Sequence, residues 1–124
     1  MKIQKFEDLD VWRQARKYVQ EVYIQTGTGN FSKDFGLRDQ IRRASVSIMA
    51  NIAEGYERKT KNEFIQFLFI AKGSCGETRS HLYVAFDLGY IEEKHFIDLK
   101  NTAEMISKSI AGFIKYLRND KYPQ

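Results

Sequence analysis

The stretch that decides the fold is GLRDQIRRASVSIMANIAEG, residues 36–55. Its apolar residues recur at steps of three and four, which is the spacing that places side chains on one face of an α-helix. These residues are Leu37, Ile41, Ala44, Ile48 and Ile52. A row of polar residues runs beside them at the same spacing and consists of Gln40, Arg43, Ser47, Asn51 and Glu54. The sequence therefore predicts one long helix with a polar seam next to its buried face.

Three other segments show the same periodicity. A first helix is expected over residues 9–26, where an aspartate precedes the pattern and Gly27 follows it. Its predicted core residues are Trp12, Ala15, Val19 and Val22. Thr60 and Glu63 form a Thr-x-x-Glu capping box that opens a third helix, and Glu92 and Glu93 suit the positive end of a fourth. Because short turns make neighbouring helices antiparallel, we expect an all-α, antiparallel up-down-up-down four-helix bundle.

Length and composition set the limits of this architecture. A chain of 124 residues fits one domain, so residues 1–124 are expected to form a single bundle. Pro123 is the only proline and Cys75 the only cysteine, so long helices are permitted and an internal disulfide is excluded. The sequence shows no signal-peptide pattern and no apolar run of membrane-spanning length, so we expect a cytoplasmic protein with no membrane contact.

The patterns that could indicate catalysis are incomplete. Di-metal enzymes on this architecture need two Glu-x-x-His pairs, and this chain has one, Glu92 with His95, in the first turn of a predicted helix. Glu77 and His81, four residues apart, lack a second set of ligands. The sequence also contains no P-loop and no Gly-x-Gly-x-x-Gly motif after a strand. We therefore expect a protein that is not an enzyme and that uses neither a metal nor another cofactor.

The formal net charge is +4, and its distribution is uneven. Residues 38–61 hold six cations against three anions, which makes them a candidate surface for phosphate groups. The candidate nucleic-acid-binding residues are Arg38, Arg42, Arg43, Arg58, Lys59 and Lys61. A second basic region near the C-terminus contains Lys108, Lys115, Arg118 and Lys121 against Asp120. Tyrosines that could stack on bases are Tyr18, Tyr23, Tyr56 and Tyr116. The alternative interpretation is a solvated charged surface.

Two glycines, Gly73 and Gly76, interrupt the third predicted helix, where each costs up to about 1 kcal/mol relative to alanine. One explanation is close packing against the small residues of the second predicted helix. The other is a buried polar network that fixes the register of the two helices and in which Arg43 neutralises the carboxylates. The residues predicted for this structural network are Asn51, Glu54, Ser74 and Glu77.

Several sequence segments of the chain are typical of one known family. They are FEDLDVWRQA, FGLRDQIRRASVSIMANIAEG with the following ER, and FIQFLFIAKGSCGET with LGYI. In their order and separation they resemble the bacterial four-helix bundle family encoded by intervening sequences of 23S ribosomal RNA genes. The resemblance covers nearly the whole chain. A related group, the accessory variability proteins of diversity-generating retroelements, shares this bundle and works with a reverse transcriptase.

The resemblance implies a ring-shaped homopentamer whose basic surface meets RNA or DNA. The positions carried into that role are Arg38, Arg42, Arg43 and Arg58, whereas Asn51 and Glu54 match the family pattern as structural residues. The alternative is a structural or protein-interaction oligomer that binds no nucleic acid. It is suggested by apolar and aromatic residues beyond the needs of one bundle, namely Phe6, Trp12, Phe31, Phe35, Tyr56, Phe69, Tyr83 and Tyr90.

Overall fold

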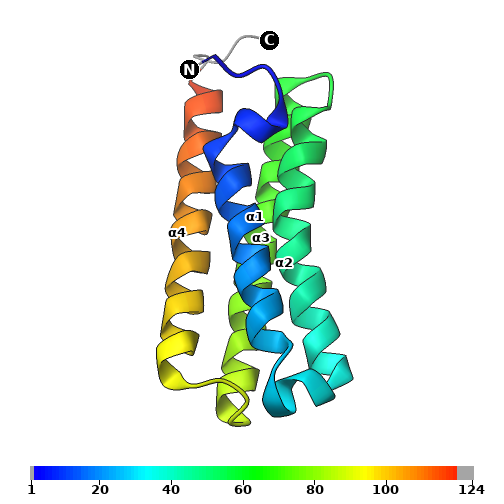
Figure 1. The fold of residues 1–124 in the computed structure, drawn as a ribbon. Coiled ribbons are helices and arrows are strands. Elements are labelled where there is room, and N and C mark those ends of the chain that lie inside the picture. Colours follow the sequence, from blue (N-terminus) through cyan, green and yellow to red (C-terminus); the bar gives the residue numbers. More distant parts are fainter. Residues whose placement is uncertain (1, 120–124) are drawn as a thin grey trace.

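Four long helices form the body of the molecule (Figure 1). The structure is a computed structural model that describes residues 2–119. The long helices are α1 (Asp10–Thr26), α2 (Phe35–Tyr56), α3 (Lys61–Asp87) and α4 (Glu93–Arg118). Two short 3-10 helices, η1 (Phe6–Asp8) and η2 (Gly29–Lys33), precede α1 and α2.

Successive helices run in opposite directions, with α1 and α3 descending and α2 and α4 ascending in the view of Figure 1. Each helix packs against two neighbours, and the neighbouring pairs are α1 with α2, α2 with α3, α3 with α4, and α4 with α1. The predicted antiparallel four-helix bundle is therefore confirmed. The α2–α3 turn lies at the upper end of the bundle, and the α1–α2 and α3–α4 connections lie at the lower end (Figure 1).

The helix ends follow the capping chemistry of the sequence. The Thr60 hydroxyl accepts a hydrogen bond from the Glu63 backbone N–H at 3.1 Å, as the capping box predicts. Asp34 caps α2 in the same way, with its carboxylate 3.1 Å from the Leu37 backbone nitrogen. Gly89 has a φ of +74°, a left-handed conformation that suits glycine and that turns the chain after α3. These three residues fix where the connections of the bundle begin and end.

The core contains fully buried side chains from every long helix, including Tyr18, Ile48, Leu68 and Ile106. For α1 the predicted core row is partly wrong. Its buried residues are Val11, Ala15, Tyr18, Val22 and Thr26, whereas Trp12 and Val19 are half-buried. The predicted row followed the flank of the apolar face, because Tyr18 and Thr26 were not counted as apolar. Burial of Tyr18 also removes this ring from the candidates for base stacking.

The glycines of α3 do not lie where the sequence predicted close packing. Gly73 and Gly76 are exposed, and a Cβ built on either would meet no atom within 4 Å. The close approach between α2 and α3 is made instead by Gly55, where a Cβ would lie 2.7 Å from the Cβ of Phe67. The prediction that Gly73 and Gly76 bring α2 close is therefore wrong, because these two residues face away from α2 into solvent.

None of the helices within residues 2–119 combines the length and the apolar character that crossing a membrane requires.

Candidate nucleic-acid interface

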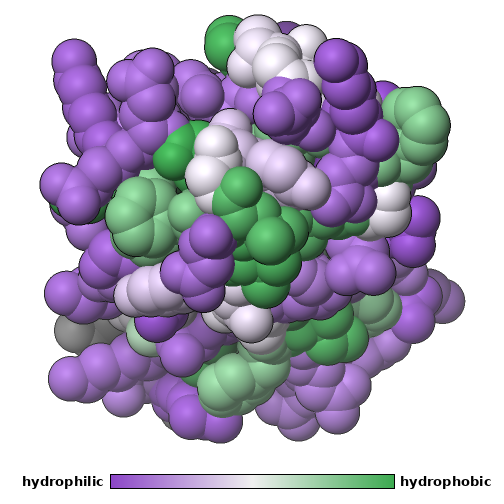
Figure 2. All heavy atoms as spheres, turned by 90° about the horizontal axis from the view of Figure 1, so that it is seen from below, coloured by the Kyte–Doolittle hydropathy of each residue, from purple (hydrophilic) through white to green (hydrophobic). Residues whose placement is uncertain are grey.

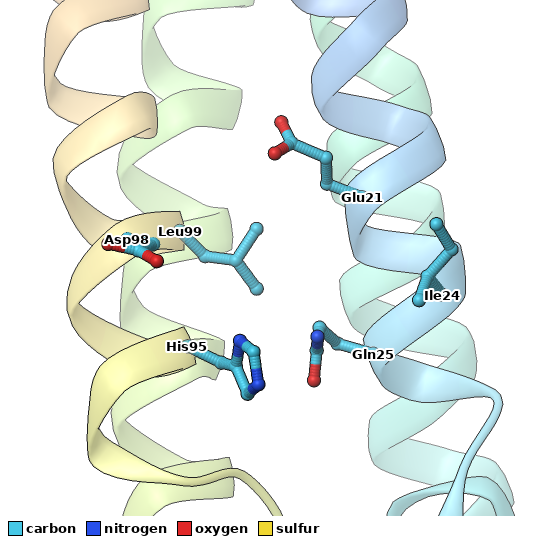
Figure 3. Close-up of a pocket in the computed structure, with 6 residues that line it drawn as sticks. All are labelled: Glu21, Ile24, Gln25, His95, Asp98 and Leu99. Atoms are coloured by element: carbon cyan, nitrogen blue, oxygen red, sulfur yellow. The ribbon is translucent and has the colours of Figure 1, made fainter.

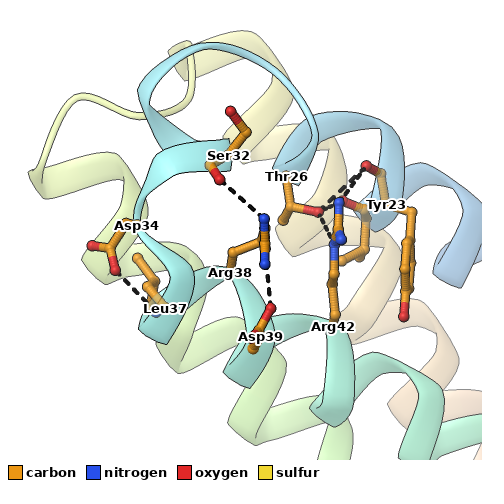
Figure 4. Close-up of polar contacts among 9 residues, drawn as sticks. Tyr23, Thr26, Ser32, Asp34, Leu37, Arg38, Asp39 and Arg42 are labelled. Carbon is orange, nitrogen blue, oxygen red and sulfur yellow. Dashed lines mark hydrogen bonds and ion pairs between the residues drawn. The ribbon is translucent and has the colours of Figure 1, made fainter.

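Arg42 is engaged in holding the lower end of the bundle together (Figure 4). Its Nε donates a hydrogen bond of 2.8 Å to the Thr26 hydroxyl, and its guanidinium lies 4.4 Å from the centroid of the Tyr23 ring. A second nitrogen lies 3.5 Å from the Tyr23 carbonyl oxygen. These partners belong to the last turn of α1, where the carbonyl groups carry partial negative charge. Arg42 therefore caps α1 and lies over the Tyr23 ring, which is itself 43% exposed.

Arg38 is also occupied by contacts within the chain (Figure 4). Its Nε lies 3.0 Å from a carboxylate oxygen of Asp39, and another nitrogen donates to the Ser32 carbonyl at 3.1 Å. The guanidinium lies 4.8 Å from the centroid of the Phe35 ring, which is itself 64% exposed. Arg43 differs from both neighbours because its side chain is exposed.

Acidic residues lie at the same end of the bundle as these arginines. Residues 87–98, which form the α3–α4 connection and its flanks, contain four acids against the single cation Lys94. The Tyr90 hydroxyl donates to the second carboxylate oxygen of Asp34 at 3.0 Å, which joins this connection to the start of α2. The hydrogen bond to Asp34 raises the pKa of the Tyr90 phenol. The acids of this connection therefore offset much of the positive charge that the arginines bring to the lower end.

Arg58, Lys59 and Lys61 lie at the opposite end, on and after the α2–α3 turn; we call them the turn cations. Arg38 and Arg58 are twenty residues apart, and a helix rises about 1.5 Å per residue, so roughly 30 Å separates them. Arg58 lies 4.9 Å above the Phe67 ring and 3.5 Å from a carboxylate oxygen of Glu63. The single basic surface centred on α2 that the sequence predicted is therefore wrong, because the length of the helix divides it into two groups.

The turn cations differ in exposure. Lys59 is exposed, the Arg58 side chain is 46% exposed, and Lys61 is half-buried. Tyr56, the last residue of α2, packs edge-on against the Phe64 ring at 5.9 Å and is half-buried. Tyr116, near the end of α4, is exposed to the same extent as Tyr23, so both remain candidates for stacking. Lys121 and Asp120 lie outside the residues that the structure describes.

The polar seam of α2 meets α3 through short side chains. The hydroxyl oxygens of Ser47 and Ser74 lie 3.0 Å apart, and the Asn51 amide donates to the Ser47 hydroxyl at 2.8 Å. Two predicted members of the network, Asn51 and Ser74, are thus joined through Ser47. Ser47 itself was not predicted as a member, although its place in the polar row could have indicated it.

The charged residues predicted for this network are not part of it. Glu54, Glu77 and Arg43 are exposed, and Glu77 lies 3.4 Å from His81 on its own helix. The seam runs along the rim of the α2–α3 contact, where short side chains stay between the helices and long charged ones extend into water. The prediction of a buried network that contains these charges is therefore wrong.

A polar hollow of about 210 Å³ separates the lower halves of α1 and α4 (Figure 3). Glu21 and Gln25 extend from α1 toward α4, and His95 extends from α4 toward Gln25. Asp98 and Leu99 complete the α4 side. Within the described part of the chain, no three histidine, cysteine or acidic side chains are grouped closely enough to hold a metal ion.

Two further hollows, of about 400 and 510 Å³, lie between α3 and α4 toward the upper end and share Phe69 and Arg118. The smaller of the two is also lined by Lys72 and Lys115. The sequence indicated Lys115 and Arg118 through the excess of cations near the C-terminus, but it gave no reason to select Phe69 or Lys72. Their proximity depends on how α3 and α4 are paired, which a single helical pattern does not contain.

The comparisons with known proteins agree on one relationship. Residues 7–112 match the family model of the 23S rRNA-intervening sequence protein. The fold is similar to the crystal structure of a protein of unknown function from the S23 ribosomal protein family of Bacteroides thetaiotaomicron, with a TM-score of 0.77 and 27% sequence identity. The alignment covers 85% of this chain and 98% of that one. The search of curated proteins found no match. The four-helix bundle and the family match across most of its length together show that this chain belongs to the 23S rRNA-intervening sequence protein family.

Proposed function

We propose that this protein is a non-enzymatic, oligomeric nucleic-acid-binding protein whose phosphate contacts begin at the α2–α3 turn. The observation that carries the proposal is the position of the turn cations Arg58, Lys59 and Lys61. They lie at the end of the bundle away from the acidic α3–α4 connection, on a turn fixed by the Thr60 cap and by the Gly55–Phe67 contact. A fixed turn lowers the entropy that ordering these side chains would cost on binding.

The modest charge of one copy makes repetition important. Three cations on one turn release few counterions, so a single copy would bind weakly at physiological salt. Family resemblance suggests a ring-shaped homopentamer, which would repeat the turn cations five times. If one nucleic acid spans several copies, the later contacts become intramolecular and the overall affinity rises.

The proposal is tested by fluorescence anisotropy of the purified protein with a structured RNA and with a matched duplex DNA, at about 50 and about 200 mM salt. The variant replaces Arg58, Lys59 and Lys61 with glutamine. The matched control replaces Lys17, Lys33 and Lys94, three exposed lysines away from the turn, with glutamine. Both variants lose the same net charge, so only the position of the removed cations differs between them. The oligomeric mass is measured on the same samples.

We expect the turn variant to bind more weakly and to depend less steeply on salt, because each duplex phosphate that is no longer neutralised lowers the logarithmic slope by about 0.9. The control variant should bind much as the unmodified protein does. Equal weakening in the two variants would show that net charge alone attracts the nucleic acid and would remove the turn from the proposal. An unmodified protein that binds no nucleic acid at low salt would overturn the proposal itself.

A second candidate function, a structural or protein-interaction oligomer, is favoured by the exposed hydrophobic residues. Of the eight aromatic residues that exceed the needs of one bundle, Phe35, Phe69 and Tyr83 are exposed, Phe31 is buried, and the other four are half-buried. At the lower end, Figure 2 shows hydrophobic side chains near the centre with hydrophilic ones around them. Phe35, the first residue of α2, and Leu88, in the α3–α4 connection, are exposed at this end.

For this candidate, the partner would be further copies of the chain or another protein; the related retroelement proteins suggest a reverse transcriptase. Affinity capture from the native host, followed by mass spectrometry, distinguishes the two candidates. A specific protein retained by the unmodified chain but not by Phe35→Asp would favour the second. Capture of nucleic acid that the turn variant fails to retain would favour the first.

A further inference from the structure

The two hollows between α3 and α4 form one continuous strip, because Phe69 and Arg118 line both; we call it the α3–α4 groove. On α3 it extends from Asn62 to Lys72, which is a length of roughly 15 Å at the rise of an α-helix. Its upper end adjoins the α2–α3 turn, since Lys61 and Asn62 line it there. The remaining lining residues are Ile65, Gln66, Ala111, Ile114, Lys115 and Asn119.

The groove has a positive charge that no carboxylate lining it within residues 2–119 neutralises. Lys72, Lys115 and Arg118 line it, and no carboxylate does so among the described residues. None of the three has an acid three or four residues away on its own helix, where an intrahelical partner would lie. Arg38 at the other end shows the contrasting case, because Asp39 neutralises it at 3.0 Å. Lys61 has a further interaction within the chain, so the charge of the groove is assigned to the other three cations alone.

An aromatic ring lies between these cations. Phe69 is 47% exposed, so part of its ring is open to a ligand. The Arg118 guanidinium lies 5.2 Å from the ring centroid. An arginine over an aromatic ring is an arrangement that accepts a flat π-system, because both the ring and the guanidinium plane can stack on one. The amides of Asn62 and Gln66 lie farther along the same strip and can exchange hydrogen bonds with base edges.

We propose that the α3–α4 groove binds a short single-stranded segment of nucleic acid. One base stacks on Phe69, and the phosphates on either side contact Lys72, Lys115 and Arg118. The inference rests on the proposed function and deepens it, because it names the form of nucleic acid that the basic end takes. Bases of a duplex present their faces to one another, so a surface ring reaches a base face only in a single strand, a loop or an end.

The test compares a labelled oligouridylate and a labelled oligothymidylate with a long blunt-ended duplex in anisotropy titrations at about 50 and about 200 mM salt. Phe69→Ala removes the ring, and Phe69→Trp keeps a stacking surface. The chain offers a matched control in Phe35→Ala, because Phe35 is also exposed beneath an arginine but lies at the acidic end. A charge variant, Lys72→Gln with Lys115→Gln, is matched by Lys33→Gln with Lys94→Gln.

We expect Phe69→Ala to weaken binding of both single strands at least about fivefold, with duplex binding unchanged. Phe69→Trp and Phe35→Ala should bind single strands as the unmodified protein does. In the groove charge variant, each phosphate that is no longer neutralised should lower the logarithmic salt slope for single strands by about 0.7. If these substitutions weaken binding of oligouridylate more than binding of oligothymidylate, that result would also support the groove. It would add that the groove contacts the ribose 2′-hydroxyl, which only RNA carries.

Single-strand affinity that is unchanged in both Phe69→Ala and the groove charge variant would overturn the inference. If the turn variant still bound more weakly in that case, the proposed function would stand without the groove. A protein that binds neither single strands nor the duplex removes the proposed function and the groove together. A change in oligomeric mass on Phe69→Ala, with single-strand affinity intact, assigns the groove to an interface between copies and equally overturns the inference.

Discussion

The hydroxyl groups of Ser47 on α2 and Ser74 on α3 lie 3.0 Å apart, within hydrogen-bond distance, and so join the two helices near their midpoints. Asn51 extends the contact by donating to Ser47 at 2.8 Å. Apolar side chains fit together in more than one register, whereas this hydrogen bond forms in one. The Ser47–Ser74 contact therefore adds specificity to a helix pair that apolar packing already holds together.

The first prediction concerns the coupling between these hydroxyls. Ser47→Ala and Ser74→Ala should each lower the free energy of unfolding by about 1 kcal/mol, because each leaves a polar partner with fewer hydrogen bonds. The double variant should be destabilised by less than the sum, because the hydrogen bond can be removed only once. Urea unfolding of the four proteins measures the coupling. Strictly additive effects would mean that the two hydroxyls do not interact.

The second prediction concerns the close approach at Gly55. Gly55→Ala places a methyl group 2.7 Å from the Cβ of Phe67, so we expect the free energy of unfolding to fall by about 1–3 kcal/mol. Gly73→Ala is the control, since its methyl group would meet no atom within 4 Å. That variant should gain about 0.5–1 kcal/mol through its better helix propensity. Thermal unfolding followed by circular dichroism distinguishes the two signs.

A third prediction separates the structural arginine from its exposed neighbour. Arg42→Gln should lower the free energy of unfolding by about 1–2 kcal/mol, because it removes a charged hydrogen bond to Thr26 and a favourable charge at the end of α1. Arg43→Gln should change stability by less than about 0.5 kcal/mol. Neither substitution is expected to weaken nucleic-acid binding as much as removal of the turn cations. Denaturation and anisotropy on the same preparations test this, and an Arg42 variant with normal stability would contradict the capping role.

The fourth prediction is an alkaline decline in stability. Burial raises the pKa of the Cys75 thiol to about 11 from an ordinary value of 9.0. Below pH 9 both the folded and the unfolded chain keep the thiol proton, so this part of the stability is fully present. Between pH 9 and 11 the unfolded chain releases the proton while the folded chain retains it, and about 2–3 kcal/mol is lost.

Burial also raises the pKa of the Tyr18 phenol, so its contribution has the same sign at higher pH. The measurement is unfolding free energy against pH for the unmodified protein and for Cys75→Ala. The variant should show a shallower decline from pH 9 to 11, whatever its stability at neutral pH. Parallel curves for the two proteins would show that the thiol does not contribute.

Much of the fold could be predicted from the sequence because its determinants are local. The Thr60 capping box, the 3.6-residue periodicity of α2 and the glycine after α3 each act over a few residues, and each lies where it was expected. The prediction was wrong for small and charged residues at the edge of the buried face. The rotation of each helix about its own axis decides whether a glycine such as Gly55 on α2 or Gly73 on α3 faces a neighbouring helix. The periodic pattern does not resolve that rotation finely enough.

The candidate site was harder to predict, because closeness in the sequence does not show which side chains lie close together in space. Arg38 and Arg58 belong to one basic stretch of sequence but lie at opposite ends of a rod. Phe69 and Arg118, nearly fifty residues apart, lie face to face only after α3 and α4 pair. The family resemblance suggests a kind of ligand but does not indicate which cations the chain uses for its own structure, as it does with Arg42.

The two ends of the bundle differ in charge, so the molecule has an electrostatic polarity along its long axis. In any assembly built by rotation about one axis, every copy points the same way along that axis, so the differences add. A dimer whose two-fold axis is perpendicular to the bundle would instead place an acidic end beside a basic one and cancel them. Rotational symmetry of the first kind thus turns a modest imbalance in one copy into an assembly with two unlike faces, one more positively charged than the other.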